Sequence, residues 1–270
     1  MLISEKIGTS ETRYKDLLET FFRDIFDESF LPSHGINHHR RVWKYAKEIL
    51  QHLSYHDFES DHLLTDNLII ACYLHDAGMS VDTGFNHGLE GRKICERFLL
   101  LNKLPLFEFS EAVMAIEHHD NKDYTIINKP ENLLTILSVA DDLDAFGFTG
   151  IYRYLEIYIT RNKSMAELGE LIINNCENRF HHFMRTYGFI PHLRDKHSER
   201  FEIINSFFQS YNQQVSSYIF DNQNISGYCG VAEIIAQILK EKKPGFDPSL
   251  LSYPDPVIQW FFAELRNEMN

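Results

Sequence analysis

A histidine followed directly by an aspartate closes the most apolar stretch of this chain. His75 and Asp76 lie near the end of the run LIIACYLHDAG, residues 68–78. Residues at i, i+3, i+4 and i+7 of this run form one stripe, which His75 continues, and Gly78 is a helix stop signal. Two polar groups are costly to bury in such a place without a partner. We therefore expect the pair to hold a metal ion at a helix C-terminus.

Two other segments repeat this pattern. His38 precedes a helical stripe of apolar residues and falls in the first turn on its buried face. The stripe in residues 133–144 carries Asp141 and Asp144 at positions where apolar residues are expected. A single buried histidine is more often a hydrogen-bonded core residue, so the metal prediction rests on the combination. Imidazole and carboxylate together suit several divalent ions, and the predicted site comprises His38, His75, Asp76 and Asp141.

These residues resemble the HD-domain metal-dependent phosphohydrolase superfamily. HGINHHRRV, residues 34–42, is similar to the opening helix of the family, whose ligand histidine corresponds to His38. His75 and Asp76 match the pair that gives the family its name. VADDLDAFG, residues 139–147, resembles the closing motif, whose first aspartate after alanine is a ligand, here Asp141. The resemblance covers residues 30 to 150 and implies an all-helical fold and hydrolysis of phosphate esters. Relatives often carry arginine in place of Asp142, which leaves the phosphate-contacting groups unassigned.

Further histidines suggest a second ion. HD proteins that hold two metals, including the HD-GYP cyclic-dinucleotide phosphodiesterases, have extra histidines at places similar to His87 and to the doublet His118 and His119. The helical period of the preceding residues favours His119 over His118, while His87 equally suits a helix cap or surface loop. The Gly-Tyr-Pro signature is missing after the doublet, so the resemblance to that subgroup is partial. The full predicted ligand set is His38, His75, Asp76, His87, His118, His119 and Asp141.

The predicted chemistry needs a metal-activated water and no side-chain nucleophile. Asp76 is expected to orient that water, and Lys122, Arg40 or Arg41 to contact phosphate, although such residues more often lie on solvated helix faces. We take Asp76 and Lys122 as the catalytic candidates. The arginine-rich and aromatic segment 179–200 suits either a substrate lid or, more simply, a surface helix pair or oligomer interface. One or two divalent ions are expected, with iron, manganese, magnesium, zinc and nickel not distinguished.

Net charge and cysteine content limit the classes of binding partner and the location that we expect. The 26 basic and 39 acidic residues give a formal charge of -13, which disfavours extended nucleic acid and anionic membranes. A small phosphorylated substrate, above all a nucleotide, remains compatible, and self-association into a homo-oligomer is left open. The 4 cysteines show no paired spacing, which favours reduced thiols and a cytoplasmic location. We find no apolar run of membrane-spanning length and no signal-peptide core.

The sequence thus predicts an all-α protein, an HD-domain helical bundle with a helical C-terminal extension packed on it. We expect an N-terminal helix in residues 1–29, within which residues 11–28 are amphipathic, an HD metal-binding core in 30–150 and a helical region in 151–270. The predicted function is a metal-dependent phosphohydrolase, a phosphomonoesterase or phosphodiesterase. The alternatives are an HD-type di-iron oxygenase, since the same ligands suit both, and a catalytically silent nucleotide-binding regulator.

Overall fold

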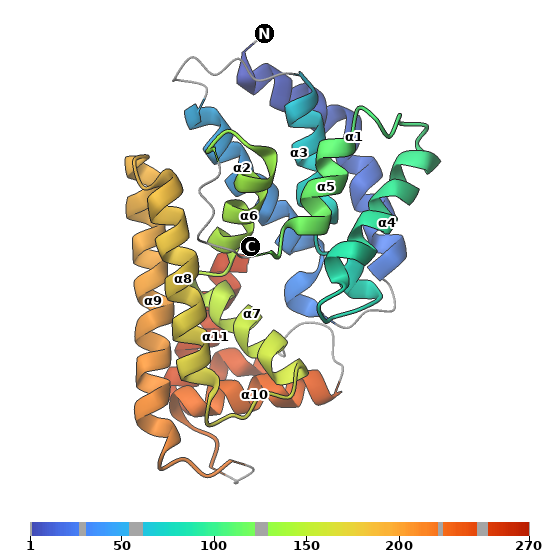
Figure 1. The fold of residues 1–270 in the computed structure, drawn as a ribbon. Coiled ribbons are helices and arrows are strands. Elements are labelled where there is room, and N and C mark those ends of the chain that lie inside the picture. The colour runs from blue at the N-terminus through green and yellow to red at the C-terminus, as the bar shows by residue number, and fades with distance from the viewer. Residues whose placement is uncertain are drawn as a thin grey trace. The chain divides into compact units, whose positions relative to one another are not determined.

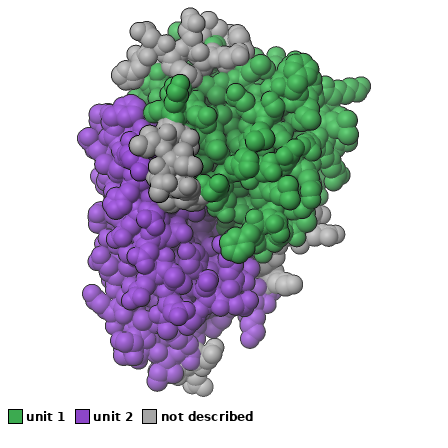
Figure 2. All heavy atoms as spheres, in the orientation of Figure 1, with its two compact units in different colours: residues 1–29, 34–143 green, residues 30–33, 144–270 purple. Residues whose placement is uncertain are grey.

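The fold is helical throughout the described part of the chain (Figure 1). The computed structural model describes residues 2–26, 31–53, 62–121, 129–220, 224–241 and 248–269. These residues contain no strand, which confirms the predicted all-α class. The chain divides into two compact units, coloured separately in Figure 2: Met1–Ser29 with His34–Leu143, and Phe30–Ser33 with Asp144–Asn270. This division falls after Leu143, a few residues before the predicted end of the core at residue 150.

The first unit is built around α3, a helix that is buried from Leu64 to its end at Leu74. Its elements are α1 (Ile3–Phe26), α2 (Ile36–Leu53), α3 (His62–Leu74), the 3-10 helix η3 (Ala77–Ser80), α4 (His87–Leu101), α5 (Ser110–His118) and α6 (Leu133–Asp144), of which the last residue is counted with the second unit. The short η1 (Pro32–His34) precedes α2 in the chain. Helix α3 contacts α1, α2, α4 and α5. Residues 68–74 have no exposed surface, as expected for a helix that is apolar on all sides. Because α3 is central, the two residues that follow it lie in the interior.

Glycines let α4 approach the end of α3 closely. Gly78 does not end a helix directly, as its sequence suggested, because α3 ends at Leu74 and Gly78 lies inside η3. A Cβ atom on Gly78 would lie 1.9 Å from the carbonyl oxygen of His87, and one on Gly88 would lie 2.5 Å from that of Glu117. Both contacts are far shorter than any real side chain allows. These glycines therefore bring the start of α4 next to η3 and to the last turn of α5.

The second unit is a separate helical bundle. It comprises α7 (Gly147–Thr160), α8 (Leu168–Tyr187), α9 (Pro191–Val215), α10 (Gly227–Glu241), η4 (Pro248–Ser252) and α11 (Pro256–Met269). Helix α8 packs along α9, and α7 contacts α9, α10 and α11. Gly188 caps the end of α8, Pro191 begins α9 and Gly227 begins α10. Proline at the first position of α9 fits its preference for that place.

Buried charges tie the second unit together. Arg200 on α9 donates to Glu268 on α11 at 2.9 Å and to the backbone carbonyl of Phe146 at 2.8 Å. The other carboxylate oxygen of Glu268 accepts from the backbone N–H of Thr149, in the first turn of α7. Arg153 pairs with the buried Asp144 at 3.3 Å. Two arginine–carboxylate pairs thus stabilise the interior of this bundle. Arg200 has a structural role in it and is not an exposed arginine available to bind phosphate.

Two further expectations concern cysteines and membranes. Cys72, Cys95, Cys176 and Cys229 are all free and buried, in agreement with the expected reduced thiols. Burial raises the pKa of Cys72 well above its ordinary value and that of Cys229 to about 12, so these thiols are poor nucleophiles. Within the described ranges, no helix combines the length and hydropathy needed to cross a membrane.

Replacement of Glu268 by alanine is expected to destabilise the second unit. The change leaves the mostly buried Arg200 guanidinium without its carboxylate and Thr149 without its cap. Because a hydrogen bond to a charged group contributes about 1.5–3 kcal/mol, we expect a loss of about 2 kcal/mol of unfolding free energy. Denaturant unfolding followed by circular dichroism measures it. Glu264→Ala, which removes the same charge one turn earlier on α11, should cost less than about 0.5 kcal/mol; equal effects of the two changes would contradict the role of Glu268.

Candidate metal centre

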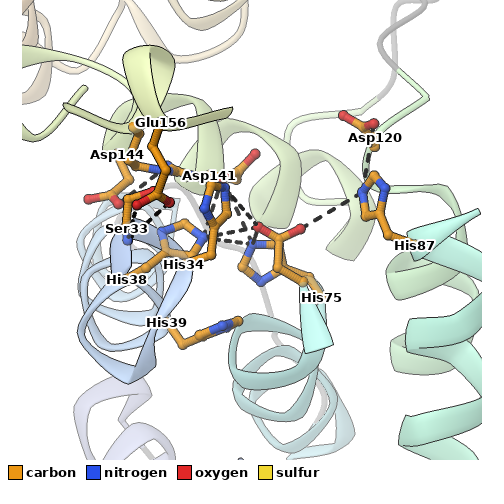
Figure 3. A network of polar contacts seen from close by, with 12 residues as sticks. Ser33, His34, His38, His39, His75, His87, Asp120, Asp141, Asp144 and Glu156 are labelled. Carbon is orange, nitrogen blue, oxygen red and sulfur yellow. Dashed lines mark hydrogen bonds and ion pairs between the residues drawn. The ribbon is translucent and has the colours of Figure 1, made fainter. Parts of the chain in front are cut away.

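Four buried side chains of the first unit form a compact group of donor atoms. His38 comes from the first turn of α2, His75 and Asp76 follow α3, and Asp141 comes from α6. The Nε2 atoms of His38 and His75 lie 3.1 Å apart, and each is 3.4 Å from Asp76 Oδ2. Asp141 Oδ1 is 3.7 Å from His38 Nε2 and 3.8 Å from His75 Nε2. Figure 3 shows His38, His75 and Asp141 converging on one point.

A second group lies on the other side of Asp76. It consists of Asp76, His87 at the start of α4 and His119 at the end of α5, all of them buried. Asp76 Oδ1 is 3.1 Å from His119 Nε2 and 3.9 Å from His87 Nε2. The two carboxylate oxygens of Asp76 therefore face different groups of imidazoles. One side chain connects the two groups.

Backbone carbonyls fix the orientation of the histidines. The Nδ1 atoms of His75, His87 and His119 lie 3.0, 2.7 and 2.7 Å from the carbonyl oxygens of Cys72, Gly84 and Ile116. A carbonyl only accepts, so each Nδ1 carries a proton and donates it. In the neutral ring, the Nε2 lone pair then points toward Asp76. This is the arrangement that metal-binding histidines adopt in proteins, and here each carbonyl is three residues before its histidine.

The pKa shifts of Asp76 and His75 indicate that the site favours positive charge. Burial would raise the pKa of Asp76, but His75, His119 and His38 hold it well below its ordinary value. Burial would likewise lower the pKa of His75, but the carboxylates of Asp76 and Asp141 raise it to about 10. Asp76 is thus an anion at neutral pH, and the carboxylates stabilise a cation beside them. A divalent ion meets the same demand while accepting the facing lone pairs of His38 and His75.

Two histidines that the sequence did not assign lie at the edge of the first group. His34 Nε2 is 4.0 Å from Asp76 Oδ2, and the His34 ring packs against that of His38 at 5.6 Å. Its spacing from His38 could have indicated it, because residues four apart share a helix face. However, His34 lies in η1, just before α2. His39 is buried, with Nδ1 3.2 Å from the same Cys72 carbonyl as His75. Burial and the neighbouring His75 and His38 lower its pKa well below the ordinary value, so His39 is a neutral packing residue.

Other predicted residues lie elsewhere. His118 is exposed and belongs to neither donor group, while its neighbour His119 is buried, as the helical period indicated. Arg40 pairs with Glu19 at 2.9 Å, and Arg41 is partly buried on α2. Asp142 is fully buried on α6. The predicted catalytic residue Lys122 lies outside the described residues, so its role stays a prediction.

The donor set fits a divalent metal. Each group combines imidazole nitrogens with carboxylate oxygens, which suits iron, manganese or zinc. With metal–ligand bonds of about 2.1 Å, neighbouring ligands are separated by about 3–3.5 Å. The donor separations of the first group lie at or slightly beyond this range. His38, His75, Asp76 and Asp141 would hold one ion, and Asp76, His87 and His119 would hold a second.

Comparison with known families agrees with this geometry. Residues 35–145 match the family model of the HD domain, a span that includes every residue of the two donor groups. Comparison with curated proteins and with solved structures gave no match. The superfamily resemblance seen in the sequence is confirmed, whereas no finding supports the HD-GYP subgroup. Residues 35–145 of the chain thus form an HD domain, a domain found in general in metal-dependent hydrolases.

Proposed function

We propose that this protein is a phosphohydrolase that uses two divalent ions to cleave a nucleotide or another small phosphate ester. The observation that carries the proposal is the position of Asp76, whose Oδ1 and Oδ2 face separate groups of imidazoles. A carboxylate shared in this way favours two neighbouring ions over one. Sites with two ions suit displacement at phosphorus, because they stabilise both the attacking and the leaving oxygen.

The chain's own residues prepare the site for this reaction. Divalent ions held by these donors supply a water of lowered pKa and neutralise charge on the phosphoryl oxygens. Asp76 keeps the two groups adjacent, and the carbonyls of Cys72, Gly84 and Ile116 hold the imidazoles with Nε2 facing inward. The buried end of α3 limits water on that side. Because the protein carries no nucleophile of its own in this mechanism, the required side chains are ligands and orienting groups.

The proposed substrate is small and anionic. A chain with a formal charge of -13 repels an extended polyanion, whereas a compact phosphate ester meets the positive charge of the ions locally. Arg40 is paired with Glu19, so we assign phosphate recognition mainly to the ions. A nucleotide satisfies these conditions and is the substrate class we propose. The cytoplasm, where such substrates are abundant, is the proposed location.

His119→Ala is expected to remove one of two bound ions. Purified protein loaded with manganese or iron should hold close to two ions per chain, and the variant close to one, because His119 belongs only to the second group. Metal analysis after gel filtration measures the ratio. His118→Ala is the matched control, since His118 is the exposed neighbour of His119 and its loss should leave both ions in place. Wild-type protein that saturates at one ion would contradict the two-ion site.

Hydrolysis is expected to depend on metal and not on oxygen. Activity should persist without oxygen, stop when a chelator removes the ions and return when manganese, iron or magnesium is restored. Asp76→Asn should lower kcat/KM by at least about 100-fold, because it weakens the ligand common to both groups. A screen of nucleotides and simple phosphate esters under anaerobic conditions, with detection of released phosphate or nucleoside monophosphate, makes the measurement. Oxygen uptake coupled to product formation, with no ester cleaved, would instead establish an oxygenase.

A further inference from the structure

One acidic side chain lies beside the second donor group without belonging to it. Asp120 Oδ2 is 3.7 Å from His87 Nε2, and Figure 3 shows the two side chains pointing toward each other. Asp120 is 47% exposed, whereas the side chains of Asp76, His87 and His119 are 7% exposed or less. The carboxylate therefore lies on the solvent side of an otherwise buried group.

Hydrogen bonds hold the backbone on both sides of Asp120. His119 continues from α5 in helical conformation, and its Nδ1 donates to the Ile116 carbonyl. The carbonyl of His119 accepts from the hydroxyl of Ser138 on α6 at 3.3 Å. The N–H of Asn121 donates to the carbonyl of His118 at 3.0 Å. Asp120 thus lies between two residues whose backbone is hydrogen-bonded, while its own side chain is half exposed.

The two donor groups differ by one carboxylate. The first has two imidazoles and two carboxylates, from His38, His75, Asp76 and Asp141, while the second has two imidazoles and only the shared Asp76. Asp120 offers the donor type that the second group lacks, and its carboxylate lies 3.7 Å from His87 Nε2. With Asp120 included, the two groups would have matching donor chemistry.

The charge balance of the site also favours a carboxylate beside the second donor group. Two divalent ions bring four positive charges to a site in which Asp76 and Asp141 carry two negative ones. The excess falls on the second ion, because Asp141 belongs to the first group. A carboxylate near the second ion offsets part of this excess, and bound cations are the dominant charges in such sites. An exposed acid paired with a histidine would contribute little; beside an ion, it would gain a much stronger partner.

We propose that Asp120 is the solvent-side carboxylate of the second donor group and raises the affinity of that group for a divalent cation. It acts on the ion either as a direct oxygen donor after side-chain rotation or by accepting a hydrogen bond from a water on it; both raise affinity through the same negative charge. The proposal rests on the two-ion site described above. It adds a residue to that site which neither the ligand spacing nor the family motif assigned.

The test compares the binding of Mn²⁺ to the metal-free full-length protein and its variants by isothermal titration calorimetry. Asp120→Asn keeps the size of the side chain and removes its charge. It should raise the Kd of the weaker ion by about 10–100-fold, the usual cost of losing a supporting group at a metal site, and leave the tighter ion unchanged. Asp120→Glu should recover most of the affinity. Glu111→Gln, an equal loss of charge on an exposed residue of the first turn of α5, should change neither Kd.

Each outcome decides the proposal. Loss of affinity for one ion in Asp120→Asn, with recovery in Asp120→Glu, supports it. Two ions bound with unchanged Kd values in Asp120→Asn overturn the role of Asp120 while leaving the two-ion site intact. Wild-type protein that binds a single Mn²⁺ overturns both. An equal loss in Glu111→Gln would show a general effect of net charge and overturns the specific role. Circular dichroism of each variant verifies that the helices remain folded.

Discussion

A buried carboxylate that must be surrounded by cations organises the first unit of this protein. Asp76 lies at the end of α3, the most buried helix of that unit, where an isolated anion would be prohibitively costly. The structure meets this cost with imidazoles from α2, α4 and α5 and from the adjacent His75. The close approach of α4, which Gly78 and Gly88 permit, follows from the same requirement. The same helices therefore form the hydrophobic core of this unit and carry the donor side chains of the site.

Much of this site could be predicted because helical phase determines which side chains point inward. His38, His75 and Asp141 each lie on the apolar stripe of their own segment. In the structure, the two histidine Nε2 atoms and Asp141 Oδ1 lie 3.1, 3.7 and 3.8 Å from one another. The same reasoning chose His119 over His118. An apolar stripe predicts which way the side chains of a helix point. This is sufficient to predict a shared site when several helices face one core.

Other features could not be read from periodicity. Asp120 is half-exposed and follows the end of a helix, so no stripe distinguishes it from an ordinary surface acid. His34 precedes α2 in a 3-10 turn, outside the helix whose phase was used. Gly78 looked like a stop signal, yet its function is to allow backbone contact between elements that are distant in sequence. The pair of Arg200 and Glu268 joins positions 68 residues apart, and its partner choice depends on the packing of the second unit.

Electron paramagnetic resonance of the manganese-loaded protein shows whether two ions share Asp76. Two Mn²⁺ ions that share a carboxylate are close enough for their electron spins to couple. We expect the broad, many-line spectrum of a spin-coupled pair at two equivalents of manganese, and its replacement by a mononuclear signal when Asp76 is changed to alanine. A spectrum at two equivalents that is only the sum of isolated Mn²⁺ ions would mean that no carboxylate is shared between them.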